Sequence, residues 1–485
     1  MNLLLVFEII YLILVLAICL RIVYETRTSV KALAYILVVI FLPIIGIFFY
    51  FSFGINYRKR ILYSKKLIDD DKIWATIRKD ISADSLNVYT GIVESLRPNK
   101  HLAKFLASEM SALSIGNDVK LLVNGEEKFP VLMKALEEAK EYIHFEYYIY
   151  ENDKIGQAIA DLLIKKAKEG VTVRFIYDDF GSRRIRKNIV RKLRAAGIEA
   201  YPFYKIVFLR IANHLNYRNH RKITIIDGRK AFVGGINISD RYINDKAYVA
   251  KNKVFWRDTH LMLEGPGIRY LQYLFICDWN FCSGKPLDNI SYFFPAYTDD
   301  LPGKKVVQIA ASGPDSANPS ILYSLLYAIY QAEEEILITT PYFIPEQSVM
   351  DALLMAALGG VSVKLLVPYK GDSKLVELAA SSYYLDLLNA GVKLFMYRKG
   401  FVHAKTIVVD RRLAMVGTAN MDFRSFDLNF EVNAIVYDHD FATQLTDLFN
   451  TDLNNAVEID ISTWSKRPAI RKLLENSARL VSPIL

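Results

Sequence analysis

The sequence predicts an α/β fold in which two homologous αβα halves share one active site, preceded by a two-helix transmembrane hairpin. Three observations predict this arrangement: two apolar runs lie before residue 55, strand and helix signals alternate beyond residue 110, and the alternation occurs twice. The repeat period is near 180 residues. Such a long period indicates two related domains, because solenoid repeats are only about 20–50 residues long.

Composition excludes several classes of protein. The chain has 485 residues, of which 52% are hydrophobic and 23% are charged, so it has the apolar surface that disordered chains lack. Its three cysteines are too few for a disulfide framework. The net charge of +9 allows an anionic partner, either a nucleic acid or an anionic membrane.

The apolar residues are concentrated at the amino-terminal end. Residues 3–20 carry one charge, Glu8, and residues 32–54 carry none. As a helix the second run reaches roughly 35 Å, which exceeds the ~30 Å hydrocarbon core of a bilayer. A signal peptide fits less well, because no Lys or Arg precedes Arg21 and a second apolar run follows. We expect residues 1–56 to be a multi-pass anchor in the plasma membrane, with the rest of the chain on the cytoplasmic side.

Beyond the anchor we expect a connecting region at residues 57–110 and a first half at residues 111–300. Within that half, β-branched and aromatic runs predict strands, and apolar positions at helical spacing predict helices. The pair Asn124-Gly125 is a turn signal that ends the first strand. The expected elements are a strand over 120–123, a helix over 131–140, a strand over 142–150, a helix over 155–168 and a strand over 170–178.

The second half, residues 301–485, repeats this order. We expect a helix over 321–332, a strand over 335–343, a helix over 350–358 and a strand over 360–368. The segment EGVTVRFIYD at 169–178 mirrors GGVSVKLLVP at 359–368. Two related halves that meet face to face create one cleft, and residues from each half should converge there.

The halves agree most closely in a short polar motif. Each copy has a His, a Lys two residues later, an Asp at position +7 and an Asn at position +17. Identical spacing in two copies is very unlikely by chance in a chain with only seven histidines. The candidate catalytic residues are His220, Lys222, Asp227, His403, Lys405 and Asp410, and the candidate phosphate-binding residues are Asn237 and Asn420.

These residue types suit phosphoryl chemistry. Side chains at positions i and i+2 of a strand share a face, so each His lies beside its Lys. An imidazole next to an ammonium is a poor site for a divalent metal and a good one for a phosphodiester, so no metal is expected. One histidine can attack phosphorus while the other protonates the departing alkoxide, and the Lys and Asn side chains stabilise the added charge. Exchange of one phosphodiester for another needs no ATP or other cofactor.

The two aspartates have two possible roles. They lie at odd spacing from the Lys, so on a regular strand their side chains face away from it. A turn-forming carboxylate at the end of a strand and a direct catalytic role are about equally supported for Asp227 and Asp410.

The paired motifs resemble the phospholipase D superfamily, and the wider pattern resembles bacterial cardiolipin synthases over nearly the whole chain. The resemblance implies two phospholipase D-like halves that condense two phosphatidylglycerol molecules into cardiolipin and glycerol through a phosphatidyl-histidine intermediate, without a metal. It also implies His220 as nucleophile and His403 as acid/base, although the motif itself is symmetric. The matching stretches include NYRNHRK, GGINISDRY, WRDTHLMLEGPG, FICDWNF and TTPYFIP.

The same resemblance supplies residues that orient the imidazoles. It places Asp258 of WRDTH and Glu431 of FEV in matching positions of the two halves. A carboxylate on the far ring nitrogen is what a nucleophilic or basic histidine requires.

Three other functions remain open at this level. The same site with water as acceptor is a phospholipase D-type hydrolase, and the superfamily also includes nucleases. A nuclease is disfavoured because a charge of +9 over 485 residues is no concentrated basic stripe. A non-enzymatic lipid-binding scaffold is disfavoured because both motif copies are complete. We therefore expect phosphatidylglycerol and the membrane as partners, and no nucleic acid.

Overall fold

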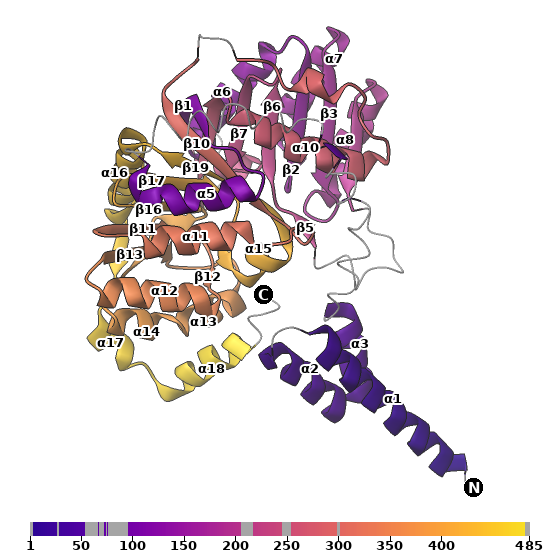
Figure 1. Ribbon diagram of the computed structural model, residues 1–485, viewed down its shortest axis with the longest axis vertical. Coiled ribbons are helices and arrows are strands. Elements are labelled where there is room, and N and C mark those ends of the chain that lie inside the picture. Colours follow the sequence, from indigo (N-terminus) through magenta and orange to yellow (C-terminus); the bar gives the residue numbers. More distant parts are fainter. Residues whose placement is uncertain are drawn as a thin grey trace.

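The computed structural model describes residues 3–26, 29–53, 96–204, 217–244, 254–297 and 301–480, with Lys66, Lys72, Ile73 and Ala75 as isolated positions. Within these residues, one sixteen-stranded mixed sheet runs through both halves (Figure 1). The halves join where β1 (Ser114–Val123) pairs antiparallel with β10 (Lys305–Ser312). The continuous sheet explains why the two halves form one body.

Each half contributes seven strands in the same order, which confirms two homologous halves in a mixed α/β fold. Counted outward from the junction, β1, β9, β7, β6, β2, β3 and β4 correspond to β10, β19, β17, β16, β11, β13 and β14. In the first half these are β2 (Tyr142–Tyr147), β3 (Thr172–Asp178), β4 (Glu199–Phe203), β6 (Lys222–Ile226), β7 (Lys230–Gly234) and β9 (Thr259–Glu264). In the second they are β11 (Glu335–Thr339), β13 (Ser362–Pro368), β14 (Lys393–Tyr397), β16 (Thr406–Val409), β17 (Leu413–Gly417) and β19 (Asn429–Tyr437).

Helices cover both faces of the sheet. One face packs against α10 (Ile268–Ser283) and α16 (His439–Leu453), whose apolar side chains join those of both halves in a single central core. On the opposite face the core is split in two. There α6 (Asn124–Glu137), α7 (Lys154–Lys168) and α8 (Ile189–Ala195) cover the first half, and α11 (Ser320–Tyr330), α12 (Gln347–Leu358), α13 (Lys374–Ser381) and α14 (Tyr384–Asn389) cover the second.

One short strand of each half crosses to pair with the other half. In the first half β5 (Arg218–Asn219) pairs in parallel with Asn429 and Phe430 of β19. In the second half β15 (Gly400–Val402) pairs in parallel with β8 (Phe255–Arg257). Each crossing strand ends at a motif histidine, so the crossings bring the two motifs together.

The structure differs from the sequence prediction at the start of the first half. Asn124 and Gly125 do not form a separate turn but begin α6, which starts seven residues before the expected helix. Asn124 adopts a φ of 58°, and its side chain accepts a hydrogen bond from the Asp258 amide at 2.9 Å. A Cβ at position 125 would lie 2.8 Å from the backbone of Tyr242, so this close approach requires glycine.

The end of the predicted connecting region belongs to the second half. Helix α5 (Lys100–Ser108) buries Leu102, Ala103 and Leu106 in the same core as α11 and α12. The rest of residues 57–110 lies largely outside the described residues.

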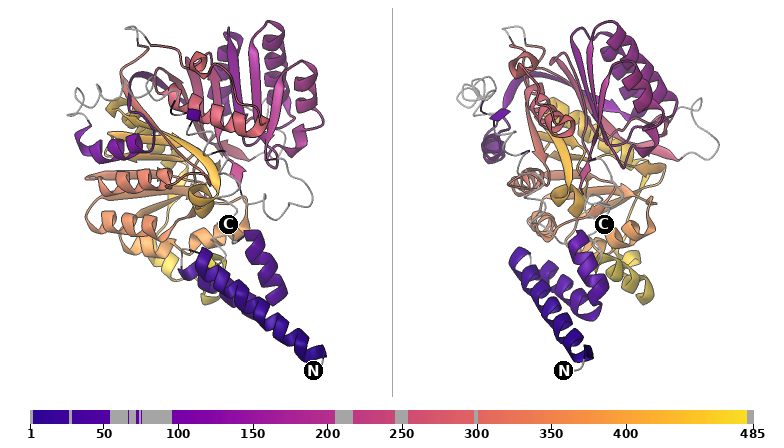
Figure 2. Two further views of the ribbon diagram at one scale, coloured as in Figure 1. Left: turned by 45° about the vertical axis from the view of Figure 1, so that its right-hand side comes forward. Right: turned by 90° about the vertical axis from the view of Figure 1, so that its right-hand side faces the viewer.

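The amino-terminal segment forms three helices rather than the predicted two: α1 (Leu3–Glu25), α2 (Ser29–Phe41) and α3 (Pro43–Phe53). The second apolar run is divided because Pro43 has no amide hydrogen to continue α2 and instead begins α3. Figure 2 shows these helices projecting from the sheet, on the side where the carboxy-terminal helix α18 (Ala469–Leu480) lies. Among the described residues, no helix combines the length and hydropathy needed to cross a membrane.

Candidate active site

The two motif histidines occupy equivalent positions at the junction of the halves. His220 follows β5, and its amide donates to the Phe430 carbonyl at 2.9 Å. His403 follows β15, and its amide donates to the Arg257 carbonyl at 2.7 Å. Both imidazoles are buried, and the backbone of each is held by a strand of the opposite half.

The carboxylates that contact these imidazoles also come from the opposite half. Nδ1 of His220 lies 2.8 Å from Oε2 of Glu431. Nδ1 of His403 lies 2.7 Å from Oδ2 of Asp258. The structure thus brings together the four residues that the sequence analysis proposed as two histidines and two orienting carboxylates. Because Nδ1 is occupied in each ring, Nε2 is the nitrogen available for chemistry.

The two carboxylates accept hydrogen bonds from different groups. Glu431 accepts hydrogen bonds from the Thr418 hydroxyl and from Nδ2 of Asn429, the latter at 3.2 Å. Asp258 accepts the Thr259 amide at 2.7 Å. The residue matching Thr418 is Gly235, where a Cβ would lie 2.1 Å from Oδ1 of Asp258. The first half therefore needs glycine where the second half uses a hydroxyl.

The motif lysines are buried close to the histidines. Nζ of Lys222 donates to the His220 carbonyl at 2.6 Å. Nζ of Lys405 lies 3.0 Å from Nδ1 of His403. Burial lowers the pKa of Lys222 to about 7 and that of Lys405 to about 8, although Glu431 and Asp258 oppose the decrease. An added negative charge nearby would therefore stabilise the protonated form of both lysines.

Burial favours the neutral form of both imidazoles. Burial lowers the pKa of His220 to about 4 and that of His403 to about 3, and the nearby lysines act in the same direction. Burial opposes ionisation of Glu431 and Asp258, yet the histidine and lysine charges hold the pKa of both carboxyls below their usual values. Near neutral pH, each neutral ring thus faces an ionised carboxylate, which suits a nucleophile or a base.

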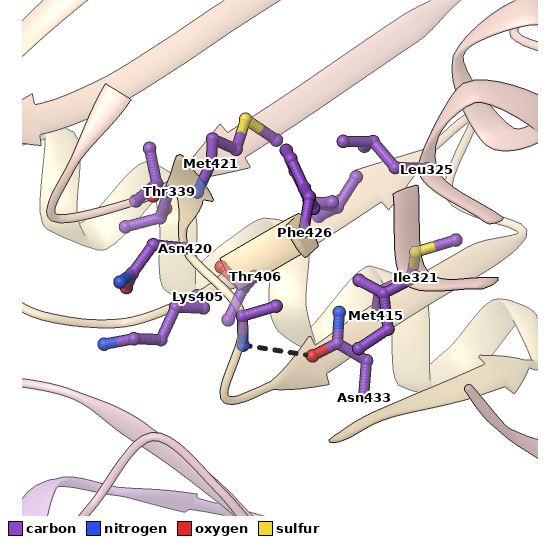
Figure 3. A pocket seen from close by; sticks show the side chains of 13 residues that line it. Ile321, Leu325, Thr339, Lys405, Thr406, Met415, Asn420, Met421, Phe426 and Asn433 are labelled. Carbon is purple, nitrogen blue, oxygen red and sulfur yellow. Dashed lines mark hydrogen bonds between the residues drawn. The ribbon is translucent and has the colours of Figure 1, made fainter. Parts of the chain in front are cut away.

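The two candidate phosphate-binding asparagines have different surroundings. Both ends of the Asn237 amide are engaged, with Oδ1 accepting the Ile149 amide at 3.1 Å and Nδ2 donating to the Tyr242 hydroxyl at 2.7 Å. Asn420 and Lys405 line one side of a pocket, as Figure 3 shows. Its other side is apolar and includes Ile321, Leu325 and Phe426.

The motif aspartates, expected to be either catalytic or turn-forming, lie at the far end of their strands from the motif histidines. The Asp227 carboxylate accepts hydrogen bonds from the backbone amides of residues 140–142, each at 2.8 Å. The Asp410 carboxylate accepts hydrogen bonds from the backbone amides of residues 333–335 at 2.8–2.9 Å. Five residues of extended chain separate Lys222 from Asp227, a span of roughly 16 Å. The turn-forming role is the one that this geometry supports, because each carboxylate holds the start of the neighbouring strand.

Two aromatic residues near the histidines were not singled out from the sequence. The Tyr148 ring lies edge-on to His220 with centroids 4.7 Å apart, and the Trp256 ring lies 5.2 Å from that of His403. Trp256 directly precedes Arg257 and Asp258, so its place in WRDTH was an available signal. In the described part of the chain, no group of three His, Cys, Asp or Glu side chains is arranged to hold a metal ion.

Two related halves, each carrying a His-x-Lys strand and each supplying the carboxylate for the other's histidine, define a protein of the phospholipase D superfamily. The family described as "Cardiolipin synthase, PLD-like domain" matches residues 132–256 and 325–453, and "Phospholipase_D-nuclease N-terminal" matches residues 9–54. The chain belongs to the cardiolipin synthase family.

Comparison with individual proteins supports the same assignment. The chain is 40% identical over 468 residues to a cardiolipin synthase of Alkalihalophilus pseudofirmus, covering 95% of this chain and 90% of the relative. It is 41% identical over 466 residues to cardiolipin synthase 2 of Bacillus cereus, covering 95% and 88%. The phosphatidylserine synthase structure from Haemophilus influenzae matches with a TM-score of 0.60 at 14% identity, covering 81% of this chain and all of that one. That likeness concerns the fold alone.

Proposed function

We propose that this protein condenses two phosphatidylglycerol molecules into cardiolipin and glycerol. The observation that carries the proposal is the crossed site, in which each buried histidine is held through Nδ1 by a carboxylate of the opposite half. This arrangement leaves two Nε2 atoms for one phosphorus, as a two-step transfer requires. Membership of the cardiolipin synthase family supports the substrate.

In the first step we assign attack on phosphorus to Nε2 of neutral His220. A nitrogen–phosphorus bond forms while the bond from phosphorus to the glycerol oxygen breaks. His403 gives its proton to that oxygen, and glycerol leaves. An anionic phosphodiester raises the pKa of nearby bases, so substrate binding favours the protonated His403 that this step needs. Glu431 stabilises the positive charge that develops on His220.

In the second step a primary hydroxyl of another phosphatidylglycerol replaces the departed glycerol. His403 takes the hydroxyl proton, the oxygen attacks phosphorus, and the bond to His220 breaks. The proton lost by His403 in the first step is thereby restored, and both histidines return to their starting state. Lys222 and Lys405 stabilise the charge on the phosphoryl oxygens in both steps.

We also propose that the catalytic halves work at the cytoplasmic face of the plasma membrane. Helix α1 exposes Leu12, Leu16 and Leu20 to solvent, and α18 exposes Leu473 and Leu474 beside basic residues. Apolar side chains next to Lys and Arg are typical of contact with an anionic bilayer. Alkaline phosphatase fused at residue 26 should be active and at residue 60 inactive if the segment forms a crossing hairpin. Inactivity at both positions would overturn the crossing, and activity at residue 60 would overturn the orientation.

One assay separates the candidate reactions. The purified full-length protein is incubated in detergent micelles with labelled phosphatidylglycerol, and the lipid products are resolved. Cardiolipin with released glycerol supports the synthase, whereas phosphatidic acid alone would make the protein a phospholipase D-type hydrolase. His220→Ala and His403→Ala should each abolish turnover. More than a few per cent of activity remaining in either variant would contradict the two-histidine mechanism.

A further inference from the structure

A buried arginine connects helix α16 to the residue that orients His403. The carbonyl of Arg257 accepts the His403 amide at 2.7 Å, and the next residue is Asp258, whose carboxylate contacts Nδ1 of His403. Arg257 is only 4% exposed, and its Nε lies 2.9 Å from the carboxylate of Asp452. Asp452 is itself buried, near the end of α16. One arginine thus links a covering helix of the second half to the carboxylate that serves the histidine.

A second nitrogen of Arg257 holds the backbone on both sides of that carboxylate. Nη1 donates to the Asp258 carbonyl at 2.7 Å and to the Thr259 hydroxyl at 2.9 Å. The Thr259 amide in turn donates to the Asp258 carboxylate at 2.7 Å. A buried ion pair is by itself weak evidence for stability, because the cost of desolvating both charges offsets their attraction. The contacts of this pair, however, lie on the groups that determine where the Asp258 carboxylate points.

The other histidine has an arginine–aspartate pair of its own. Arg221 directly follows His220, its guanidinium pairs with Asp278 of α10, and its Nε lies 3.5 Å from the Glu431 carbonyl. Like Arg257, it contacts an aspartate of a covering helix and the carbonyl of an orienting carboxylate residue. The two pairs have no residue in common, so each can be altered without the other.

We propose that Arg257 and Asp452 are positioning residues for the acid/base function of His403. This inference rests on the proposed function, and it assigns to both residues an effect that passes through Asp258. A general acid transfers its proton only within hydrogen-bond reach of the leaving oxygen, so a small displacement of the imidazole costs rate. Loss of the pair should therefore impair the proton transfer by His403 more than the attack by the nucleophile.

Two leaving groups separate the functions of the two histidines. Glycerol leaves phosphatidylglycerol as an alkoxide that takes a proton from His403, whereas 4-nitrophenolate leaves a phosphatidyl nitrophenyl ester as a stable anion and needs no proton. In both reactions Nε2 of His220 forms a bond to phosphorus while the bond to the leaving oxygen breaks. First-turnover release of labelled glycerol and of nitrophenolate is measured in micelles with the same full-length preparation. The ratio of the two rates reports the acid, and loss of folded protein does not change it.

We expect Asp452→Asn and Arg257→Met to slow glycerol release at least about tenfold more than nitrophenolate release. Arg257→Lys keeps the charge but lacks the planar fork that reaches both Asp452 and the Asp258 carbonyl, so its ratio should lie between those of wild type and Arg257→Met. Asp278→Asn should slow both reactions alike, because the nucleophile takes part in both.

The matched control is Asp447→Asn, since Asp447 is an exposed aspartate on the same helix as Asp452. It should change neither rate. A wild-type ratio in Asp452→Asn would overturn the proposal even if both rates fell, and so would an equal change of the ratio in Asp278→Asn. His403→Ala tests the proposed function separately, because it should lose glycerol release and retain nitrophenolate release. Loss of both in that variant would refute the acid role of His403, and this inference with it.

Discussion

Oε2 of Glu431 lies 2.8 Å from Nδ1 of His220, although 211 residues separate them along the chain. The reciprocal pair, Asp258 and His403, spans 145 residues. Neither half therefore contains a complete catalytic unit. The candidate site lies where the crossing strands β5 and β15 pair with the opposite half.

The Glu431 contact predicts a large catalytic effect with little loss of fold. Glu431→Gln keeps the size of the side chain but removes the charge that stabilises an imidazolium at His220. We expect cardiolipin formation to fall by about 10²–10⁴-fold, as for other histidines deprived of their carboxylate. Rapid-quench measurement of phosphatidyl-enzyme formation should show that the first step is the one slowed.

The control for this variant is Glu458→Gln, since Glu458 is an exposed glutamate on the edge strand β20 (Ala456–Glu458). It should behave as wild type. A rate for Glu431→Gln within about threefold of wild type would show that the carboxylate does not assist His220.

Much of the fold could be predicted from the sequence because it depends on local patterns. Alternating strand and helix signals and the repeated motif predicted two related α/β halves. The crossing strands could not be predicted, because β5 and β15 have only two and three residues and pair across the halves. The division of the second apolar run at Pro43 was visible as a proline within an apolar run, but tolerance of proline in membrane helices favoured a single helix.

In the candidate site, too, some features could be predicted from the sequence and others depend on tertiary structure. The spacing of the motif located both histidines and both lysines, and family resemblance located Glu431 and Asp258. Which carboxylate serves which histidine depends on tertiary structure, since each one crosses to the other half. The aspartates were ambiguous because spacing alone does not distinguish a catalytic carboxylate from one that binds backbone amides.

The placement of Asp410 predicts a loss of stability rather than of chemistry. Its carboxylate accepts three backbone amides at the start of β11. Asp410→Ala leaves those amides without their charged acceptor, so we expect the free energy of unfolding to fall by about 2–4 kcal/mol. Denaturant unfolding measures this loss, while the activity of the folded fraction should remain near wild type.

Asp410→Asn is the informative companion variant. Asparagine tolerates the φ of 49° and retains one acceptor oxygen, so its loss of stability should be smaller. A fully folded Asp410→Ala protein without activity would restore the catalytic interpretation.

The buried lysines predict an alkaline decline in activity. The pKa of Lys222 is about 7 and that of Lys405 about 8 in the free enzyme, so both lose their protons as the pH rises through this range. Because kcat/KM reports the free enzyme, we expect it to decrease between about pH 7 and 9. A bound phosphodiester favours the charged ammonium and raises both pKa values. The decline in kcat should therefore occur at higher pH than that in kcat/KM.

The check is a pair of pH profiles measured at saturating and at low phosphatidylglycerol in one detergent. The substrate phosphodiester is ionised throughout, so it contributes no titration of its own. A kcat/KM that rises from pH 7 to 9 would contradict the assignment of charged lysines to phosphate stabilisation.

Helix α18 predicts a difference between bilayer and micelle assays. Leu473 and Leu474 are 61% and 52% exposed, and they lie beside Arg471 and Lys472. Burial of a leucine in an apolar environment contributes about 1.5–3 kcal/mol. Replacement of both leucines by glutamine should therefore weaken binding of the catalytic halves to a bilayer. We expect the double variant to make cardiolipin about 3–10-fold more slowly in phosphatidylglycerol vesicles, with little change in micelles, where substrate diffuses to the site.

Leu358→Gln, at a leucine 74% exposed at the end of α12, is the matched control and should lower neither rate. Equal rates of the double variant and wild type in vesicles would mean that α18 does not contact the membrane.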